Sequence, residues 1–412
     1  MKANDAIRIV GPETARMLDL GHPWVVADSY TRKWPVGASG QSVGLCDNQG
    51  RFLATALLDP EERIVARVLD RRRIQLDRPW LTEQLRSAIE LRLSHADLHD
   101  SNACRLVNAE GDGLPGLTVD RYAEYLMLQL YSTAWRPHLK LITQVLQDIL
   151  PTTHGIYEKS RPQKTRELEA VSDSKAYGRL LAGKPAPQRL EVRENGLTFL
   201  VTLEQGLNTG LFLDQRLNRR DLMQRVKGKR LLNLFSYTGA FSVAAAAAGA
   251  AAVTSVDAST GYTNWARDNF AANRLNPKQH EFIVGDCLTV LGKLTQSRKN
   301  YDIILMDPPS FSTTTKNRFT TRGGTSDLVA ASLPLLTDGG LIITSSNHQK
   351  VDSTEYLKEL RRGALQAGCD LRVISLLGQP EDFPYPVTFP EGRYLKYAVC
   401  VKTGGTAKMG TP

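Results

Sequence analysis

The sequence lacks both a long apolar run and a paired cysteine motif. No segment reaches the roughly 18 consecutive apolar residues that a membrane-spanning helix needs, and the first residues lack the apolar core of a secretory signal. The few cysteines lie far apart and form no C-x-x-C pair; they are Cys46, Cys104, Cys287, Cys369 and Cys400. We therefore expect a cytoplasmic protein that has no disulfide framework and no metal site.

The composition is that of an ordinary globular protein with an excess of basic residues. Apolar residues make up 42% of the 412 positions and charged residues 23%, and a chain of this length usually folds into two or three domains. Lysine and arginine outnumber aspartate and glutamate by 52 to 43. Such an excess favours a polyanionic partner such as RNA, although many basic proteins bind none.

The first half of the chain separates into two regions by its pattern of apolar residues. Residues 1–75 contain short apolar runs divided by turn signals, which indicate a small β-rich module. Residues 76–190 combine a helical pattern with further strands, which indicates a linker helix and a central α+β domain. Within this region, the polar stretch 164–187 predicts a loop that contributes nothing to the core.

Residues 191–403 predict a third, larger domain. From about residue 229 onward, strands alternate with helices, and the expected strands include 231–234, 253–256, 281–284, 301–306 and 340–345. This order is typical of an open, mostly parallel α/β sheet with crossover helices. Residues 404–412 are expected to form a disordered tail.

Small or acidic residues follow the first three of these strands. In an open α/β sheet, ligands bind beyond the carboxyl ends of the strands, where the strand order reverses. Gly239 follows the first strand and allows a ligand to approach, although an ordinary tight turn explains a lone glycine equally well. Asp257 and Asp286 follow the next two strands, where carboxylates can accept the ribose hydroxyls and the adenine amine. A single aspartate there is more often a helix cap, but two in succession favour a nucleoside site.

A full G-x-G-x-x-G motif is missing after the first strand. That motif makes room for the pyrophosphate of a dinucleotide. An adenosine without phosphates fits the strand ends better, which indicates S-adenosylmethionine rather than NAD.

The segment Asp307-Pro-Pro-Ser-Phe311 ends the fourth strand. Pro308 and Pro309 fix the backbone and have no N–H groups, so the turn offers carbonyl and carboxylate acceptors. Phe311 adds a flat apolar face on which a base can stack. A rigid proline loop without a ligand is the alternative, but the position beside the predicted nucleoside site favours an acceptor base.

Several segments resemble the RlmI-type methyltransferases of large-subunit (23S) ribosomal RNA. They are Asp112–Arg121, Gly206–Arg216, Asn233–Gly239, Asp307–Phe311 and Pro390–Lys396. The resemblance implies a β-rich PUA RNA-binding domain, a small central α+β domain and a C-terminal Rossmann-like class I methyltransferase domain. It also implies S-adenosylmethionine as cofactor and ribosomal RNA or an assembling large subunit as partner, and it leaves a homodimer open.

The same resemblance assigns a set of residues to the cofactor. Those that line it would be Phe235, Tyr237, Gly239, Asp257, Asp286 and Asp307, with Asp214, Gln215 and Arg216 beside them.

One position departs from the family's pattern. Members that methylate carbon 5 of cytidine carry a cysteine just after the strand that follows the Asp-Pro-Pro motif. Carbon 5 is not nucleophilic until a thiolate adds to carbon 6, so this chemistry requires the cysteine. Here Asn347 stands at that position, and neither Cys287 nor Cys400 is a natural substitute.

Ser346-Asn347, together with the Asp-Pro-Pro motif, is more similar to the branch of the family that methylates guanine N7. A ring nitrogen already has a lone pair, so orientation beside a methyl donor can suffice. The expected catalytic set is Asp307, Pro308, Pro309, Phe311 and Asn347. Asn347 would hold the base edge or cap a loop, and His348 would accept a proton or simply be exposed.

Three other interpretations stay open. Cytosine carbon 5 would be the acceptor if another thiol reached the base. A non-catalytic RNA-binding assembly factor would keep the fold, but the acidic strand ends argue against it. A nicotinamide dehydrogenase is disfavoured by the missing glycines.

Overall fold

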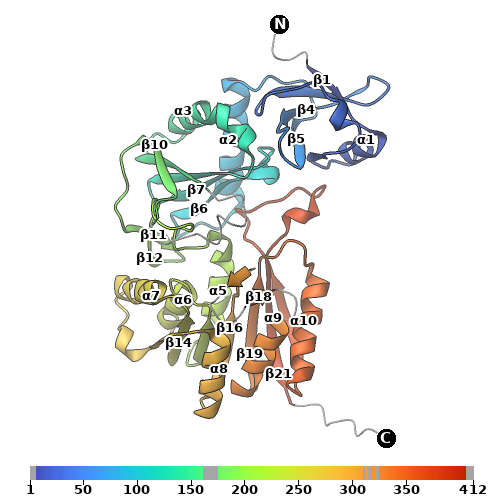
Figure 1. Ribbon diagram of the computed structural model, residues 1–412. Helices are drawn as coiled ribbons and strands as arrows, with labels where there is room; N and C mark the ends of the chain where they lie inside the picture. The colour runs from blue at the N-terminus through green and yellow to red at the C-terminus, as the bar shows by residue number, and fades with distance from the viewer. Residues whose placement is uncertain (1–5, 161–174, 310, 314–317, 321–323, 405–412) are drawn as a thin grey trace, which may run out of the picture. The chain divides into compact units, whose positions relative to one another are not determined.

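The computed structural model describes residues 6–160, 175–309, 311–313, 318–320 and 324–404. The chain divides into two compact units (Figure 1). The N-terminal unit comprises residues 1–192, 201–209 and 381–392, and the C-terminal unit comprises residues 193–200, 210–380 and 393–412. Two short segments from later in the chain therefore belong to the N-terminal unit. The boundaries at 75/76 and 190/191 expected from the sequence stay predictions.

The N-terminal unit begins with a five-stranded sheet of order β1-β3-β4-β5-β2. Its elements are β1 (Ile7–Ile9), α1 (Pro12–Asp19), β2 (Trp24–Val26), β3 (Ser42–Cys46), β4 (Phe52–Leu58) and β5 (Ile64–Asp70). Leu18 of α1 packs with Val25, Leu45 and Ala56 of the sheet in one apolar cluster. The expected β-rich module is present.

A second five-stranded sheet in this unit has the order β10-β9-β8-β7-β6. Its elements are α2 (Arg78–His95), β6 (Ala103–Asn108), β7 (Leu117–Tyr122), β8 (Tyr125–Leu130), α3 (Leu139–Ile149), β9 (Gly155–Lys159) and β10 (Gly178–Gly183). Asp77 caps α2 by accepting a hydrogen bond from the Trp80 N–H (3.1 Å). Leu81, Leu85 and Ile89 of this helix are buried in the core of the sheet.

Strand β10 corrects one expectation from the sequence, because it lies inside the stretch 164–187 that was expected to be a loop. The strand pairs antiparallel with β9 at the edge of the sheet. Its residues are only partly buried, so they show no apolar alternation, and the backbone of β9 supplies the pairing instead. Residues 161–174 of the same stretch lie outside the described residues.

The C-terminal unit is built on a seven-stranded sheet of order β15-β14-β13-β16-β19-β21-β20. The strands are β13 (Arg230–Leu234), β14 (Ala252–Asp257), β15 (Glu281–Val284), β16 (Tyr301–Met306), β19 (Leu336–Ser346), β20 (Asp370–Leu377) and β21 (Lys396–Thr403). All pairs from β15 to β19 are parallel, and only β21 runs antiparallel to its neighbours. The expected open, mostly parallel α/β sheet is confirmed.

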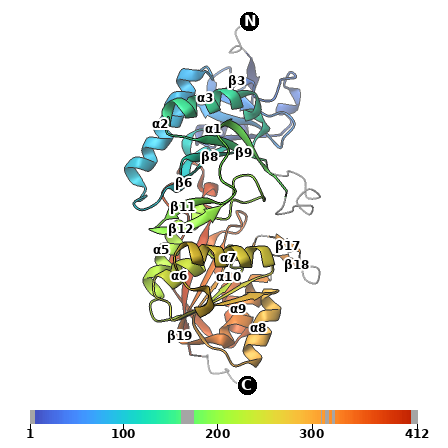
Figure 2. The same ribbon diagram turned by 90° about the vertical axis from the view of Figure 1, so that its left-hand side faces the viewer.

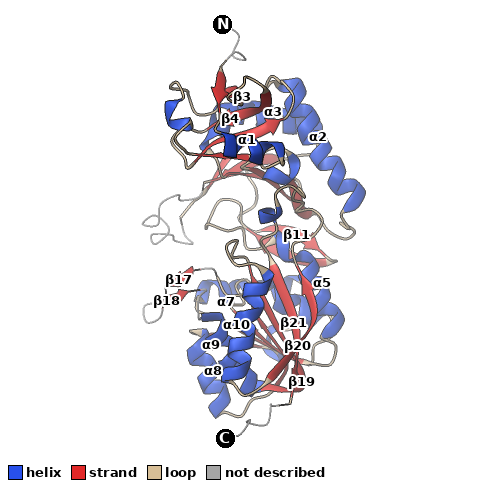
Figure 3. Ribbon diagram, turned by 90° about the vertical axis from the view of Figure 1, so that its right-hand side faces the viewer, coloured by secondary structure: helices blue, strands red, loops and turns tan. Residues whose placement is uncertain are grey.

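Helices cover both faces of this sheet. They are α5 (Arg216–Arg225), α6 (Ala240–Ala247), α7 (Thr260–Ala272), α8 (Cys287–Gln296), α9 (Gly324–Ser332) and α10 (Ser353–Gln366). Figure 2 views the sheet from the side of α6 and α7, and Figure 3 from the side of α10. Successive residues of β13 point to opposite faces, so Leu231 packs with α5 and α6 while Leu232 packs with α8, α9 and α10. Strands buried on both faces explain the continuous apolar runs in the sequence.

Two further sheets have two strands each. They are β11 (Leu190–Glu194) with β12 (Leu197–Val201), and β17 (Phe311–Thr313) with β18 (Arg318–Thr320). Within the described part of the chain, no helix combines the length and the apolar character that crossing a membrane requires.

A close approach of α9 and α10 generates a stability prediction. A Cβ atom at Gly363 of α10 would lie 2.6 Å from the Ser326 carbonyl oxygen and 2.7 Å from Val329 Cβ, whereas a Cβ at Gly292 of α8 would meet nothing within 4 Å. Alanine favours a helix by up to about 1 kcal/mol over glycine. We expect Gly292→Ala to stabilise the protein and Gly363→Ala to destabilise it by about 1–3 kcal/mol, measured by urea unfolding. Equal stabilisation by both would contradict the packing described here.

Candidate functional site

The turn after β13 has an unusual backbone. Phe235 and Tyr237 adopt left-handed φ values of 57° and 51°, and Gly239 has a φ of 77°. Such angles are costly for residues with a Cβ and are kept only where surrounding contacts fix them. The Ser236 N–H donates to the Val256 carbonyl (2.9 Å), and the Gly239 N–H donates to the Ser236 carbonyl (2.8 Å).

Gly239 is required by packing as well as by its backbone angle. A Cβ at this position would lie 2.7 Å from the Cβ of Ala266 in α7. The glycine therefore lets α7 approach the first turn of α6, which begins at Ala240. This tight-turn explanation accounts for Gly239 without a ligand, so its place in the cofactor site stays a prediction.

Asp257 connects the ends of the first two strands. Its Oδ2 accepts a hydrogen bond from the Tyr237 N–H (2.8 Å), and its Oδ1 accepts one from the Ser259 N–H (2.9 Å). Each carboxylate oxygen has two lone pairs, so both can also accept a ribose hydroxyl. The side chain is partly exposed, which leaves it accessible to a ligand at this edge.

Asp286 has the helix-cap role considered from the sequence, and its place in the cofactor site stays a prediction. It is the N-cap of α8, and its Oδ1 accepts hydrogen bonds from the N–H and the hydroxyl of Thr289, both at 3.0 Å. Its Oδ2 has no partner among the described residues. Because β15 lies beside β14, Asp257 and Asp286 follow neighbouring strands at the same edge of the sheet.

Asp307 is held in a polar cluster at the end of β16. The side chain of Gln215 donates to Asp307 Oδ2 (3.0 Å) and to Ser345 Oγ (2.9 Å). Asn218 in turn donates to Gln215 Oε1 (2.6 Å). The hydroxyl of Tyr394 donates to Asp214 Oδ2 (2.7 Å).

The surroundings raise the pKa of the Asp307 carboxyl to about 6. Desolvation by the surrounding protein is the largest cause, and repulsion from Asp214 adds to it. Hydrogen bonds from Ser345 and Gln215, together with the charge of Arg219, act in the opposite direction. The carboxylate is therefore mostly ionised at neutral pH, although these partners offset the cost of its desolvation only in part.

Three members of this cluster were not expected from the sequence. Ser345, Asn218 and Tyr394 carry no motif that marks them as polar contacts of Asp307, Gln215 or Asp214. Ser345 lies 130 residues from Gln215 and Tyr394 lies 180 residues from Asp214, so only the fold brings them together.

Arg216 begins α5, and its side chain is fully buried. Its carbonyl oxygen accepts a hydrogen bond from the side chain of Asn195 (3.0 Å). The buried guanidinium presents no surface to a ligand in this structure. Contact with the cofactor stays a prediction for Arg216.

The residues expected to hold the base lie at the ends of neighbouring strands. Met306 pairs with Thr344 in the parallel ladder of β16 and β19, so Asp307 and Asn347 follow adjacent strands at one edge. Pro308 is buried, while Pro309 and Asn347 are exposed. Ser310 and the side chain of Phe311 lie outside the described residues, so the expected stacking stays a prediction.

His348 is partly buried beside this edge. Desolvation lowers the pKa of its imidazole, and the charges of Lys396 and Lys350 lower it further. The ring is therefore neutral at neutral pH and able to accept a proton or a hydrogen bond.

The cysteines do not supply a nucleophile at this edge. Burial raises the pKa of Cys287 to about 12 and that of Cys400 to about 11. Cys369 precedes β20, which runs parallel to β19, so it lies at the opposite edge of the sheet. Cys46 and Cys104 are buried in the N-terminal unit.

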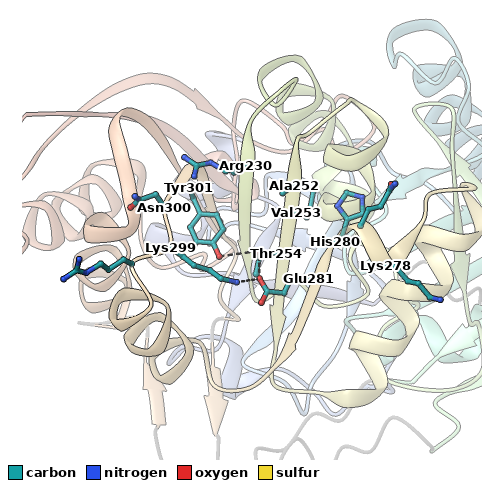
Figure 4. Close-up of a pocket in the computed structure, with 12 residues that line it drawn as sticks. Arg230, Ala252, Val253, Thr254, Lys278, His280, Glu281, Lys299, Asn300 and Tyr301 are labelled. Atoms are coloured by element: carbon teal, nitrogen blue, oxygen red, sulfur yellow. Dashed lines mark hydrogen bonds and ion pairs between the residues drawn. The ribbon is translucent and has the colours of Figure 1, made fainter.

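A cavity of about 430 Å³ lies at that opposite edge (Figure 4). It is lined by residues that begin strands, among them Arg230, Glu281 and Tyr301. Lys299 pairs with Glu281 (2.6 Å) and the Tyr301 hydroxyl donates to Thr254 Oγ1 (3.3 Å). Because the strand-end carboxylates lie at the other end of the same strands, this cavity is separate from the candidate site.

In the part of the chain that the structure describes, no group of three His, Cys, Asp or Glu side chains is arranged to hold a metal ion.

The strand order and the acidic strand ends define a Rossmann-like nucleoside-binding α/β protein. A family model for the S-adenosylmethionine-dependent methyltransferases matches residues 105–390, and a model for a PUA-like domain matches residues 9–71. The chain belongs to the S-adenosylmethionine-dependent methyltransferase family, and its N-terminal sheet is a PUA-like domain.

Curated relatives agree with this assignment over nearly the whole chain. Proteins named ribosomal RNA large subunit methyltransferase I from Yersinia pseudotuberculosis and Yersinia pestis are each 33% identical over 380 residues, which cover 92% of this chain and 95% of theirs. The expected fold class, family, cofactor and methyltransferase activity are confirmed.

Solved structures show the same architecture. The crystal structure of the methyltransferase SMU.776 complexed with S-adenosylhomocysteine (SAH) has a TM-score of 0.85 and 29% identity, covering 96% of this chain and 99% of that one. An S-adenosylmethionine-dependent methyltransferase from Streptococcus mutans has a TM-score of 0.83 at the same identity and coverage.

The strand-end carboxylates predict a defined loss of cofactor affinity. If Asp257 accepts the ribose hydroxyls, Asp257→Ala weakens S-adenosylmethionine binding about 10- to 100-fold, because hydrogen bonds to a charged group contribute roughly 1.5–3 kcal/mol. Calorimetry of the folded variant measures this. Asp268→Ala is the control, since Asp268 is exposed on α7 and should bind as the wild type does. Unchanged binding by Asp257→Ala would remove this residue from the site.

The pKa of Asp307 predicts a pH-dependent stability difference. Because its folded value of about 6 lies above the reference of 3.8, the folded state binds the proton more tightly, and stability falls as pH rises from about 4 through 6. Asp307→Asn keeps the shape and removes the charge. Without methyl donor we expect the variant to be more stable than wild type by roughly 1–3 kcal/mol at pH 7.5 and by much less at pH 4.5, measured by urea unfolding. A variant that is less stable at pH 7.5 would contradict the desolvation of Asp307.

Proposed function

We propose that this protein methylates a base of large-subunit (23S) ribosomal RNA, with guanine N7 as the acceptor. The observation that carries the proposal is the row of carboxylates at the carboxyl ends of β14, β15 and β16, beside which Asn347 is exposed after β19. The names of the relatives support ribosomal RNA as the substrate, and the PUA-like domain suits an RNA ligand. Homodimer formation and independence of metals stay predictions.

The proposed division of labour follows the strand order. Asp257 and Asp286 bind the nucleoside of S-adenosylmethionine, which supplies an electrophilic methyl group. Asp307, the carbonyls of Pro308 and Pro309, and Asn347 orient the acceptor base in line with that methyl group. The lone pair of guanine N7 forms the new N–C bond while the S–C bond breaks and its electron pair stays on sulfur.

The charge of Asp307 suits this acceptor. Methylation at N7 removes no proton and leaves a positive charge on the purine. A carboxylate with a pKa of about 6 is ionised at neutral pH, and a cationic ring beside it offsets the cost of its desolvation. No general base is required, so His348 need only accept a hydrogen bond.

The thiol chemistry argues against cytosine carbon 5. That reaction needs a thiolate at carbon 6 of the base, but Cys287 and Cys400 are buried with strongly raised pKa values. Asn347, at the position where the family's cysteine is expected, has no nucleophilic atom. A ring nitrogen that attacks with its own lone pair needs no thiolate and no other nucleophile from the protein.

Mapping the methyl groups of ribosomal RNA tests the proposal. Mass spectrometry of 23S RNA from a deletion strain should show the loss of one 7-methylguanosine. Treatment with borohydride and aniline, which cleaves RNA at 7-methylguanosine, should no longer cut the RNA at that position. Restoring the gene returns the methyl group, whereas Asp257→Ala does not. Loss of a 5-methylcytidine would overturn the acceptor atom, and loss of no methyl group would overturn ribosomal RNA as substrate.

A further inference from the structure

Residues at or just before the start of β21 contact two sides of the candidate site. The Tyr394 hydroxyl bonds to Asp214 (2.7 Å). The ammonium of Lys396 donates to the carbonyl oxygens of His348 (2.6 Å) and Tyr394 (2.8 Å). Lys396 pairs with Ser346 across β19 and β21, so its side chain reaches the backbone directly after β19, where Asn347 lies.

Lys396 is buried to an extent that is unusual for a lysine, with only 4% of its surface exposed. Desolvation lowers the pKa of its ammonium to about 8, and only the charge of Asp352 opposes this shift. A buried charge is costly unless its donors are satisfied. Here the two carbonyls accept hydrogen bonds from two of its three N–H donors, and both belong to segments that border the site.

We infer that Lys396 is a positioning residue that fixes the Asn347–His348 loop in the shape that presents the acceptor base. The inference rests on the proposed function for the identity of that base. The His348 carbonyl also accepts a hydrogen bond from the Val351 N–H (3.2 Å), and the His348 N–H lies 3.4 Å from Ser346 Oγ, a long contact. A bond of 2.6 Å to a charged donor is the stronger restraint on the His348 carbonyl.

The same strand contains a matched lysine at its other end. Lys402 of β21 donates to the carbonyl oxygens of Leu333 (3.2 Å) and Leu336 (2.8 Å). Leu333 lies before β19 and Leu336 is its first residue, at the edge opposite the candidate site. Lys402 also forms an ion pair with the exposed Asp338 (3.2 Å). It therefore makes the same kind of carbonyl contact as Lys396 without touching the loop after β19.

The test compares Lys396→Met, Lys396→Arg and Lys402→Met in the full chain. Methionine keeps the length and removes the donors, and it also removes the cost of a buried charge, so the variant should fold. We measure transfer of tritiated methyl groups to transcribed 23S RNA, binding of S-adenosylmethionine, and hydrogen exchange of peptides spanning residues 345–351.

For Lys396→Met we expect kcat/KM toward RNA to fall about 10- to 100-fold, because a misplaced base loses alignment with the methyl group. Affinity for S-adenosylmethionine should stay within twofold of wild type, and exchange at residues 345–351 should become faster. Lys396→Arg should retain part of the methyl transfer that Lys396→Met loses. Lys402→Met should match the wild type, both in methyl transfer per folded molecule and in hydrogen exchange at residues 345–351.

Other results overturn the inference. Lys396 would be an ordinary structural residue if Lys396→Met transferred methyl groups and exchanged the amides of this loop as the wild type does. The same conclusion would follow if both methionine variants lost methyl transfer to the same extent. An inactive wild-type protein would instead contradict the proposed function, and the exchange comparison would still decide whether Lys396 fixes the loop.

Discussion

The reversal of strand order between β13 and β16 is the constraint on which the candidate site depends. The chain proceeds from β13 to β14 and β15 on one side and returns to β16 and β19 on the other. Because these strands are parallel, all their carboxyl ends meet at one edge. Asp257, Asp286, Asp307 and Asn347 are therefore gathered by topology, although they span 90 residues of sequence between the first and the last.

Hydrogen bonds then fix the side chains and turns that the strand order brings together. Asp257 ties the left-handed turn after β13 to the end of β14, and Gln215 bridges Asp307 and Ser345 on the other side of the reversal. This edge of the sheet also contains energetically costly features. Phe235 and Tyr237 have left-handed φ values, and the carboxyl of Asp307 has a raised pKa. Strain and desolvation of this kind are commonly concentrated where a ligand is bound.

The sequence could predict the features that depend on short stretches of chain. The alternation of strands and helices after residue 229 predicted the sheet, and Asp257 and Asp307 were found because each directly follows an apolar strand. The cluster of Gln215, Ser345 and Asn218 was not predictable, because its members are joined only across the folded sheet. Strand β10 was missed because a partly buried edge strand has no apolar alternation. Asp286 illustrates a true ambiguity, since one oxygen caps a helix and the other has no partner among the described residues.

In the proposed reaction, the base is presented to the methyl donor without covalent attack by a thiol. The most direct measurement uses 23S RNA in which 5-fluorocytidine replaces cytidine, incubated with the protein and tritiated S-adenosylmethionine. A thiol mechanism traps the enzyme on fluorinated cytosine as a complex that survives denaturing electrophoresis. We expect methyl transfer to the substituted RNA at an undiminished rate and no trapped complex. A covalent protein–RNA band that requires S-adenosylmethionine would contradict the proposed reaction.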